Sequence, residues 1–472
     1  MISGDGLVIH HSFFSPATLA AYQPGQSWPA NFLPLSSWIM SLFFKFLPIN
    51  DFTIALIGYL FFIICLGLTF FIAKKLHSLR AGILATLLFA SSLFFYDYAQ
   101  NASSEIFFTL EILSFVYLAL QKSKIRWLSL FPLVLMFLTR QQAILFLLSI
   151  PAYFVIFHLK SWRTRLITVL SAVVILSSLY LVAKKDVSSI YSPLKPFYSA
   201  QATAGVSQGL YLRGQDYKKD AITPKAIFSK VFYNIYNFAK DPERLAPSVI
   251  FFLLILSFFS PKNRQFTYFT ATVFVFFVLG AAASLPNARY VHPIMPLVFI
   301  STSLTLIQIL DKYSPLNLNF KLFLVLIFIT IPTLGYFTLD ARFRRQQFNL
   351  DMPPVYRQIS KVMADNIPSG QVIITNLDAW ASWYEGLTTM WFPISPDLLV
   401  GHQDKVKYIV ITNYLENDGD FSLGEWREVV YSPDKITNKF LKDNYKILKT
   451  FIIQPDQVYE NQSFLGTILV RR

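Results

Sequence analysis

Five ionisable residues beside apolar segments are the best candidates for chemistry in this chain of 472 amino acids. They are the acids Asp97 and Glu105, the arginines Arg140 and Arg289, and His292. A carboxylate can deprotonate an attacking hydroxyl group, and the planar guanidinium group of arginine donates two hydrogen bonds to one phosphate. Gathered at one membrane face, these residue types would predict a site for a charged lipid head group.

Each of these positions also has a purely structural interpretation. Ionisable residues at membrane depth are costly and usually functional, but long charged side chains near helix ends can reach the interface with water on their own. Ser104 and Glu105 also stand where a helix N-cap and an acid in the first turn would be favourable. Both interpretations stay open for any single position, whereas several such residues on one face favour a functional site.

The composition places the chain in a membrane. Hydrophobic residues make up 54% of it, charged residues only 14%, and the mean hydropathy is +0.46. A soluble protein has about 25% charged residues. The net charge of +14 comes from Lys and Arg in short loops between apolar segments, as in the cytoplasmic loops of membrane proteins. We therefore expect membrane lipids as partners and no nucleic acid.

About ten apolar segments could cross the roughly 30 Å hydrocarbon core, for which about 20 residues suffice. Two of them are short, and the interruption at residues 139–142 leaves open a tight hairpin or one broken helix. The segments are 52–73, 80–96, 104–120, 127–139, 141–158, 163–183, 246–260, 265–284, 289–311 and 319–338.

The cationic loops fall at every second connection, namely 74–80, 122–126, 160–165, 262–264 and 312–321. The positive-inside rule makes these loops cytoplasmic, so the candidate site residues lie outside the cytoplasmic membrane. The segment 1–51 is then an outer loop with a juxtamembrane helix at 33–48. Residues 52–338 form the transmembrane domain, with an outer loop at 185–245 in which Pro224 begins an amphipathic interfacial helix. No apolar segment precedes this first loop, so we expect a missing upstream helix rather than a translocated tail.

From residue 339 the pattern becomes that of a soluble, extracytoplasmic α/β domain, 339–472. Helices are predicted at 352–366, 378–385 and 435–445, and strands at 371–376, 388–392, 408–412 and 464–470. The fold class is therefore a polytopic α-helical membrane protein with a C-terminal soluble α/β domain. There is no glycine-rich phosphate loop, and one cysteine and scattered histidines predict no metal site.

Four sequence stretches in order resemble the GT-C superfamily of membrane glycosyltransferases. They are YQPGQSWPANFLPLSSWI, FFYDYAQNASSEIFFTLEIL, FLTRQQ and NARYVHPIMPL, followed by the outer α/β domain. Within this superfamily the chain is similar to the protein O-mannosyltransferases and the lipid A aminoarabinose transferases. The resemblance implies transfer of a sugar, with inversion, from a polyprenyl-phosphate-linked donor to an unknown glycan, lipid or protein acceptor. It leaves a divalent metal ion open as a cofactor.

The same resemblance implies roles for individual residues. Ser104-Glu105 matches the family's acidic site at the start of a span, and Arg289 with His292 matches the cationic segment at the lipid phosphate. Arg140 stands where the family often has Arg-Pro, here Arg-Gln. The family's catalytic Asp follows its first spanning helix. Asp5, the only acid before Phe32, resembles a loop residue downstream of that motif, which again suggests an N-terminal truncation.

Two other functions compete with a transferase. A flippase or transporter for lipid-linked sugars needs charges along a path through the membrane, and Glu111 is the main ionisable residue in the middle of a span. A non-catalytic envelope scaffold would depend on the C-terminal domain alone. It would tolerate the loss of both Asp5 and Glu105.

Overall fold

The computed structural model describes residues 35–122, 124–159, 161–168, 170–171, 213, 224–259, 263–284, 287–312, 353–456 and 463–472, with residues 2–3, 6–7, 11–12, 14 and 19–20 of the N-terminal segment. The chain forms two compact units. A helical unit comprises residues 32–204 and 222–344, and an α/β unit comprises residues 1–31, 205–221 and 345–472. The predicted spans 163–183 and 319–338 lie largely or wholly outside the described residues.

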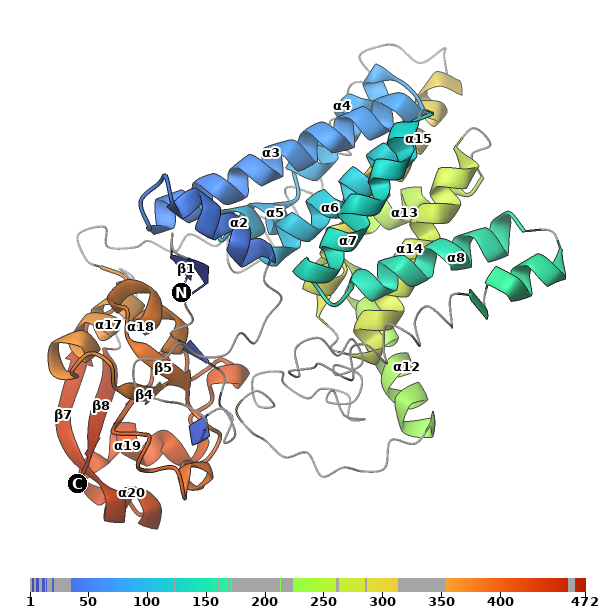
Figure 1. Ribbon diagram of the computed structural model, residues 1–472. Coiled ribbons are helices and arrows are strands. Elements are labelled where there is room, and N and C mark those ends of the chain that lie inside the picture. The colour runs from blue at the N-terminus through green and yellow to red at the C-terminus, as the bar shows by residue number, and fades with distance from the viewer. Residues whose placement is uncertain are drawn as a thin grey trace. The chain divides into compact units, whose positions relative to one another are not determined.

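The helical unit consists of helices that follow the predicted segments closely (Figure 1). They are α2 (Leu35–Phe44), α3 (Asp51–Leu76), α4 (Leu79–Ala90), α5 (Leu93–Gln100), α6 (Ser104–Ala119), α7 (Leu130–Thr139), α8 (Ala143–Phe157), α12 (Pro224–Lys240), α13 (Ser248–Ser257), α14 (Arg264–Ala283) and α15 (Met295–Lys312). Local signals explain their ends. Asn50 caps α3 by accepting a hydrogen bond from the Thr53 amide, and Lys74 and Lys75 occupy its last turn.

The predicted span 80–96 is a bent pair of helices, because it breaks at Ser91-Ser92 into α4 and α5, which meet at 66°. The Ser91 hydroxyl donates to the Leu88 carbonyl, and the Ser92 amide donates to Phe89 in a shortened turn. Serine side chains compete with helical hydrogen bonds in this way. The break turns the residues after Ser92 away from the axis of α4.

Cationic loops that are far apart in sequence meet at one end of the helical unit. Lys75, in the last turn of α3, donates to the Gln121 side chain after α6 at 2.5 Å. Arg80, at the start of α4, pairs with Asp311 at the end of α15 at 3.0 Å. This grouping is the one that the alternation of loop charges predicts.

Within the described part of the chain, three helices are long and apolar enough to cross a membrane, or four if the bent pair α4–α5 is one span. They are α3, α14 and the stretch His292–Lys312 that ends in α15. Helices α2, α8 and α13 are apolar but shorter. The chain is thus a helical membrane protein, while the total of about ten spans stays a prediction.

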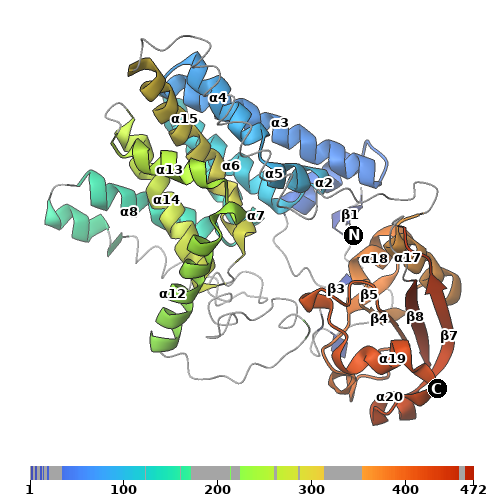
Figure 2. The same cartoon turned by 180° about the vertical axis from the view of Figure 1, so that it is seen from behind.

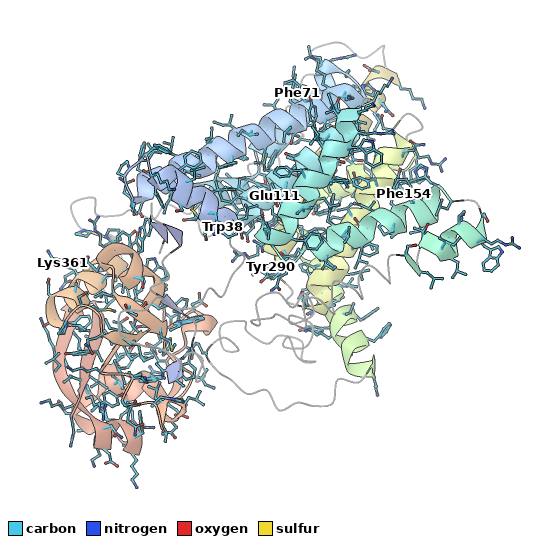
Figure 3. The ribbon with its side chains drawn as sticks, in the orientation of Figure 1. Trp38, Phe71, Glu111, Phe154, Tyr290 and Lys361 are labelled. Carbon is cyan, nitrogen blue, oxygen red and sulfur yellow. The ribbon has the colours of Figure 1, made fainter. Side chains whose placement is uncertain are left out.

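Large apolar side chains cover the outer surface of these helices. Trp38, Phe71 and Phe154 are each about half exposed and lie on that surface (Figure 3). On α12, which begins at Pro224 as predicted, Phe228 is exposed, whereas Asn234 is buried and donates to the Ala282 carbonyl at 2.8 Å. An apolar face that points away from the protein suits a helix lying in the membrane interface.

The α/β unit is built on a six-stranded sheet with the order β3-β5-β4-β6-β8-β7. Its strands are β3 (His11–Ser12), β4 (Val372–Thr375), β5 (Thr388–Trp391), β6 (Tyr408–Thr412), β7 (Tyr445–Ile453) and β8 (Phe464–Arg471). The first four in spatial order are parallel, and β8 and β7 are antiparallel to their neighbours. The sheet is therefore partly parallel.

Helices cover both faces of this sheet and make two cores (Figures 1 and 2). On one face α17 (Val355–Asn366) and α18 (Asp378–Glu385) pack on Ile373 and Val410. On the other, α19 (Arg427–Tyr431) and α20 (Lys439–Asn444) pack on Ile374 and Ile409. Adjacent strand residues face opposite cores, which explains why β4 and β6 are apolar throughout.

Three features of this unit differ from the prediction. Strand β7 was missed, because only its ends are buried and its middle is exposed. The predicted helix 435–445 is shorter, because a turn at Pro433–Lys435 precedes α20. The two residues of β3, expected in an outer loop of their own, pair with β5 in the sheet. A two-residue strand carries no periodic signal that a sequence could reveal.

Candidate active site

A buried carboxylate and two arginines from three distant segments meet at one end of the helical unit. Glu105 lies in the first turn of α6, Arg140 follows the last residue of α7, and Arg289 lies in the 3-10 turn Ala288–Tyr290. Arg140 Nη1 and Arg289 Nε each lie 2.6 Å from Glu105 Oε1. Three of the predicted site residues are thus brought into one cluster, which we call the Glu105 cluster.

The backbone explains how the two arginines reach Glu105. Arg140 is the C-cap of α7, with φ −149° and ψ 144°, so the chain leaves the helix there and its side chain turns toward α6. The turn before Arg289 is closed by Asn287, whose side chain accepts from the Arg289 amide at 3.0 Å. The sequence left open whether residues 139–142 form a tight hairpin or interrupt one broken helix. In the structure they form a short hairpin between α7 and α8 (Figure 1).

The two arginines have different environments. Arg140 is 8% exposed, and its Nη1 also donates to Ser104 Oγ at 2.7 Å while its Nε donates to Gln142 at 2.8 Å. Arg289 is 50% exposed and uses Nε for Glu105. Arg140 is therefore committed to holding the carboxylate, whereas part of the Arg289 guanidinium group faces outward.

The charge of the Glu105 cluster is positive, with two cations against one carboxylate. A fully buried carboxylate is stable only when it is paired and hydrogen-bonded. Glu105 is 0% exposed and has both arginines. Ser104 is not a helix cap, because Ser103 takes that position and the Ser104 hydroxyl binds Arg140. Two paired arginines leave one net positive charge at the cluster, which favours an anion beside Arg289.

His292 is buried next to this cluster and is held by both ring nitrogens. Its Nδ1 lies 2.5 Å from the Tyr98 hydroxyl and its Nε2 lies 2.8 Å from the Arg244 carbonyl. A carbonyl only accepts, so the proton belongs on Nε2 and the Tyr98 hydroxyl donates to Nδ1. Phe94 stacks on the ring at 4.3 Å. This arrangement fits a residue that fixes α5 beside the turn of Arg289 better than one that binds substrate directly.

Asp97 takes part in neither of these ion pairs. Asp97 is exposed near the end of α5 and accepts a hydrogen bond from Asn101 at 3.3 Å. Asp5 lies outside the described residues. Among the residues that the structure describes, no three His, Cys, Asp or Glu side chains converge as metal ligands would. Glu105 already accepts hydrogen bonds from two guanidinium groups, so its carboxylate does not fit a divalent cation as a further partner.

Glu111 lies deeper in α6, the helix that begins near Glu105, and it binds Thr139, the residue before Arg140. Thr139 Oγ1 donates to Glu111 Oε1 at 2.5 Å, and the second carboxyl oxygen has no hydrogen-bond partner among the described residues. Tyr290 lies toward the end of the helical unit and Glu111 farther inside it (Figure 3). Thr139 and Arg140 thus connect the end of α7 to α6 at two positions, Glu111 and Glu105.

Sequence reasoning missed three contributors to the site. Tyr98 and Gln142 are uncharged, and Arg244 contributes only a backbone carbonyl, so none of them stands out by residue type. Tyr98 could have been suspected from its place between Asp97 and Glu105. The sequence does not show that the Arg244 carbonyl accepts from His292, because every residue has a backbone carbonyl.

One family model matches part of the chain. Residues 29–184 match the model of the family described as dolichyl-phosphate-mannose-protein mannosyltransferase. No curated protein sequence matches the chain.

Solved structures share the fold at low identity. ArnT from Cupriavidus metallidurans, bound to undecaprenyl phosphate, is 11% identical with a TM-score of 0.50, over 93% of this chain and 88% of that one. The Archaeoglobus fulgidus oligosaccharyltransferase in complex with Zn and sulfate is 14% identical with a TM-score of 0.52, over 95% and 66%. AglB from Archaeoglobus fulgidus, with an inhibitory peptide and a dolichol-phosphate, is 13% identical with a TM-score of 0.52, over 96% and 68%.

Proposed function

We propose that this chain, which has the fold of the GT-C superfamily of membrane glycosyltransferases, transfers a sugar from a polyprenyl-phosphate-linked donor to an acceptor outside the cytoplasmic membrane. The observation that carries the proposal is the Glu105 cluster, in which one buried carboxylate holds two arginines at 2.6 Å. The solved structures that share the fold include complexes with undecaprenyl phosphate and with a dolichol-phosphate.

In this proposal the donor phosphate binds Arg289. An acceptor oxygen attacks the anomeric carbon, the bond from that carbon to the phosphate oxygen breaks, and polyprenyl phosphate leaves. The donor phosphate is already anionic and gains further negative charge as this bond breaks, so a guanidinium group beside it stabilises both the bound donor and the transition state. Attack from the face opposite the phosphate inverts the anomeric centre. A mannose-like hexose or a pentose is the expected sugar.

We propose a positioning role for Glu105. A carboxylate that accepts hydrogen bonds from two guanidinium groups is a poor proton acceptor, because its charge is already compensated. Glu105 and Arg140 would therefore orient Arg289 toward the phosphate. The proton of the acceptor hydroxyl must go to another base. Asp97, with its exposed carboxylate, and Asp5 are the remaining candidates.

The test uses the purified full chain in lipid nanodiscs with a polyprenyl-phosphate-linked sugar. Release of polyprenyl phosphate should depend on Arg289, and Arg289→Ala should raise the KM for the donor by roughly 10- to 100-fold, as expected for the loss of a hydrogen-bonded charge. Arg289→Lys should restore part of this loss. Arg126→Ala, which removes an exposed cation elsewhere, is the matched control.

The remaining variants separate the roles of the acids. Glu105→Gln should raise KM in the same direction as Arg289→Ala, whereas loss of a base should lower kcat with little change in KM. Asp97→Asn and Asp5→Asn therefore test which acid is the base. An unchanged KM in Arg289→Ala would overturn the phosphate role. Movement of the donor across the membrane without release of polyprenyl phosphate would favour a transporter instead.

A further inference from the structure

A cavity of about 400 Å³ in the α/β unit has cationic side chains at four of its eight lining residues. They are Lys405, Lys407, Arg471 and Arg472, and Asp404 is the only acid among the lining residues. Cavities of roughly 300–1,000 Å³ are typical of small-molecule sites. This site lies in a different unit from the Glu105 cluster, and the proposed transfer reaction does not use it.

Strand pairing explains why the cations gather there. Strand β8 runs antiparallel to β6, so Val470 lies opposite Tyr408, and the Arg471 amide donates to the Lys407 carbonyl at 2.9 Å. Strand β4 runs parallel to β6 on its other side, with Ile373 beside Tyr408. The amino ends of β4 and β6 thus meet the carboxyl end of β8, and each contributes residues to the cavity.

The charge of the lining residues is unbalanced, because four cationic side chains face the Asp404 carboxylate and the α-carboxylate of Arg472. Among the described residues, neither Lys407 nor Arg471 forms an ion pair. Arg472 is held in place, because its Nε donates to the Tyr445 carbonyl at 3.1 Å. Gathering like charges costs free energy that a bound anion would offset.

We infer that this cavity binds a phosphoryl group, carried either by a small soluble phosphorylated molecule or by a phospholipid head group. A phosphomonoester carries about −1.5 to −2 charges at neutral pH, which matches the excess of cations better than a single carboxylate does. Arg471 can supply a two-point hydrogen bond to such a group, and Lys407 supplies a point charge. The polar lining beside the start of β4 leaves room for the rest of the ligand.

The experiment measures binding by calorimetry with the full chain in phosphatidylcholine nanodiscs. Inorganic pyrophosphate is the soluble probe, and dihexanoyl-phosphatidic acid, whose head group is a phosphomonoester, is the lipid probe. Lys407→Ala and Arg471→Ala should each weaken binding by about tenfold, since hydrogen bonds to charged groups are strong. Lys361→Ala on α17 removes a cation outside the cavity and should leave binding unchanged (Figure 3).

The Glu105 cluster could also attract these probes, so Arg289→Ala is measured in parallel. Binding that survives Arg289→Ala but weakens in Lys407→Ala and Arg471→Ala supports the cavity whether or not the chain proves to be a transferase. Binding of pyrophosphate identifies a soluble phosphate as ligand, and binding of the lipid alone identifies a head group. No binding of either probe, or equal losses in Lys361→Ala and Lys407→Ala, would overturn the inference.

Discussion

At Gly58 of α3, a single added methyl group should disturb the helices that hold the Glu105 cluster. A Cβ atom at this position would lie 1.8 Å from the Ala99 carbonyl oxygen of α5 and 3.1 Å from Ala102 Cα. An ordinary contact between carbon and oxygen needs roughly 3.3 Å. Gly58→Ala therefore requires α5 to withdraw from α3 by about 1.5 Å, because a backbone oxygen cannot rotate away as a side chain can.

This displacement reaches the site directly. Ala99 follows Tyr98, whose hydroxyl lies 2.5 Å from His292, and Ala102 lies in the turn that leads into α6 and Glu105. A misplacement of about 1 Å can lower a reaction rate by roughly 10²-fold. Overpacking of this kind typically costs about 1–3 kcal/mol of stability. We expect Gly58→Ala to lower both the melting temperature and the rate of release of polyprenyl phosphate.

Gly67, in the same helix, provides a matched control. A Cβ there would have no atom within 4 Å, so Gly67→Ala adds the same methyl group to α3 without a clash. Because alanine favours helix more than glycine does, Gly67→Ala should leave stability unchanged or raise it by up to about 1 kcal/mol. Both variants are compared in nanodiscs by thermal unfolding and by the release assay. Indistinguishable behaviour of the two would refute the close approach of α3 and α5.

Three further predictions concern buried or hydrogen-bonded charges. Glu111→Gln retains an acceptor for its threonine partner and should melt close to the unchanged chain, whereas Glu111→Leu should melt lower; equal melting would argue against this hydrogen bond. Arg213 is 1% exposed and donates to three backbone carbonyls, so Arg213→Ala should destabilise the α/β unit by ~3 kcal/mol in chemical denaturation, against less than ~1 kcal/mol for the exposed Arg427→Ala. Hydrogen bonds from Thr437 lower the pKa of Glu428. The ionised Glu428 carboxylate therefore stabilises the fold above the unfolded pKa of ~4.3, and this stabilisation is lost as the pH falls through the lowered pKa. Glu428→Gln should remove this loss of stability at acid pH.

Arg213 also explains why residues 205–221 belong to the α/β unit. Its guanidinium group stacks on the Phe392 ring at 3.6 Å and binds the backbone around Pro393 and Ser422. The sequence places this segment in a long outer loop of the membrane domain, because nothing local distinguishes a buried arginine from a solvated one. Its role depends on carbonyls about 180 residues away in the chain.

The sequence by itself determined the features that depend on local pattern. Apolar length placed α3, α6, α8 and α14, and short apolar strands placed β4 and β6, because burial on both faces needs apolar residues throughout. Loop charges predicted that the loops after α3, α6 and α15 share an end of the helical unit, where Lys75 contacts Gln121 and Arg80 contacts Asp311. Residue chemistry selected five candidates, of which the structure brings Glu105, Arg140 and Arg289 into contact and leaves Asp97 outside their ion pairs.

Only the tertiary structure determined the separate roles of Arg140 and Arg289 beside Glu105. The sequence does not distinguish the two arginines. In the structure Arg140 is buried and donates to Ser104 and Gln142, whereas Arg289 is half exposed, so only Arg289 can contact a ligand. The break at Ser91-Ser92 and the contact at Gly58 depend on helices that meet across the unit. Such effects arise from distances between segments, which local periodicity does not encode.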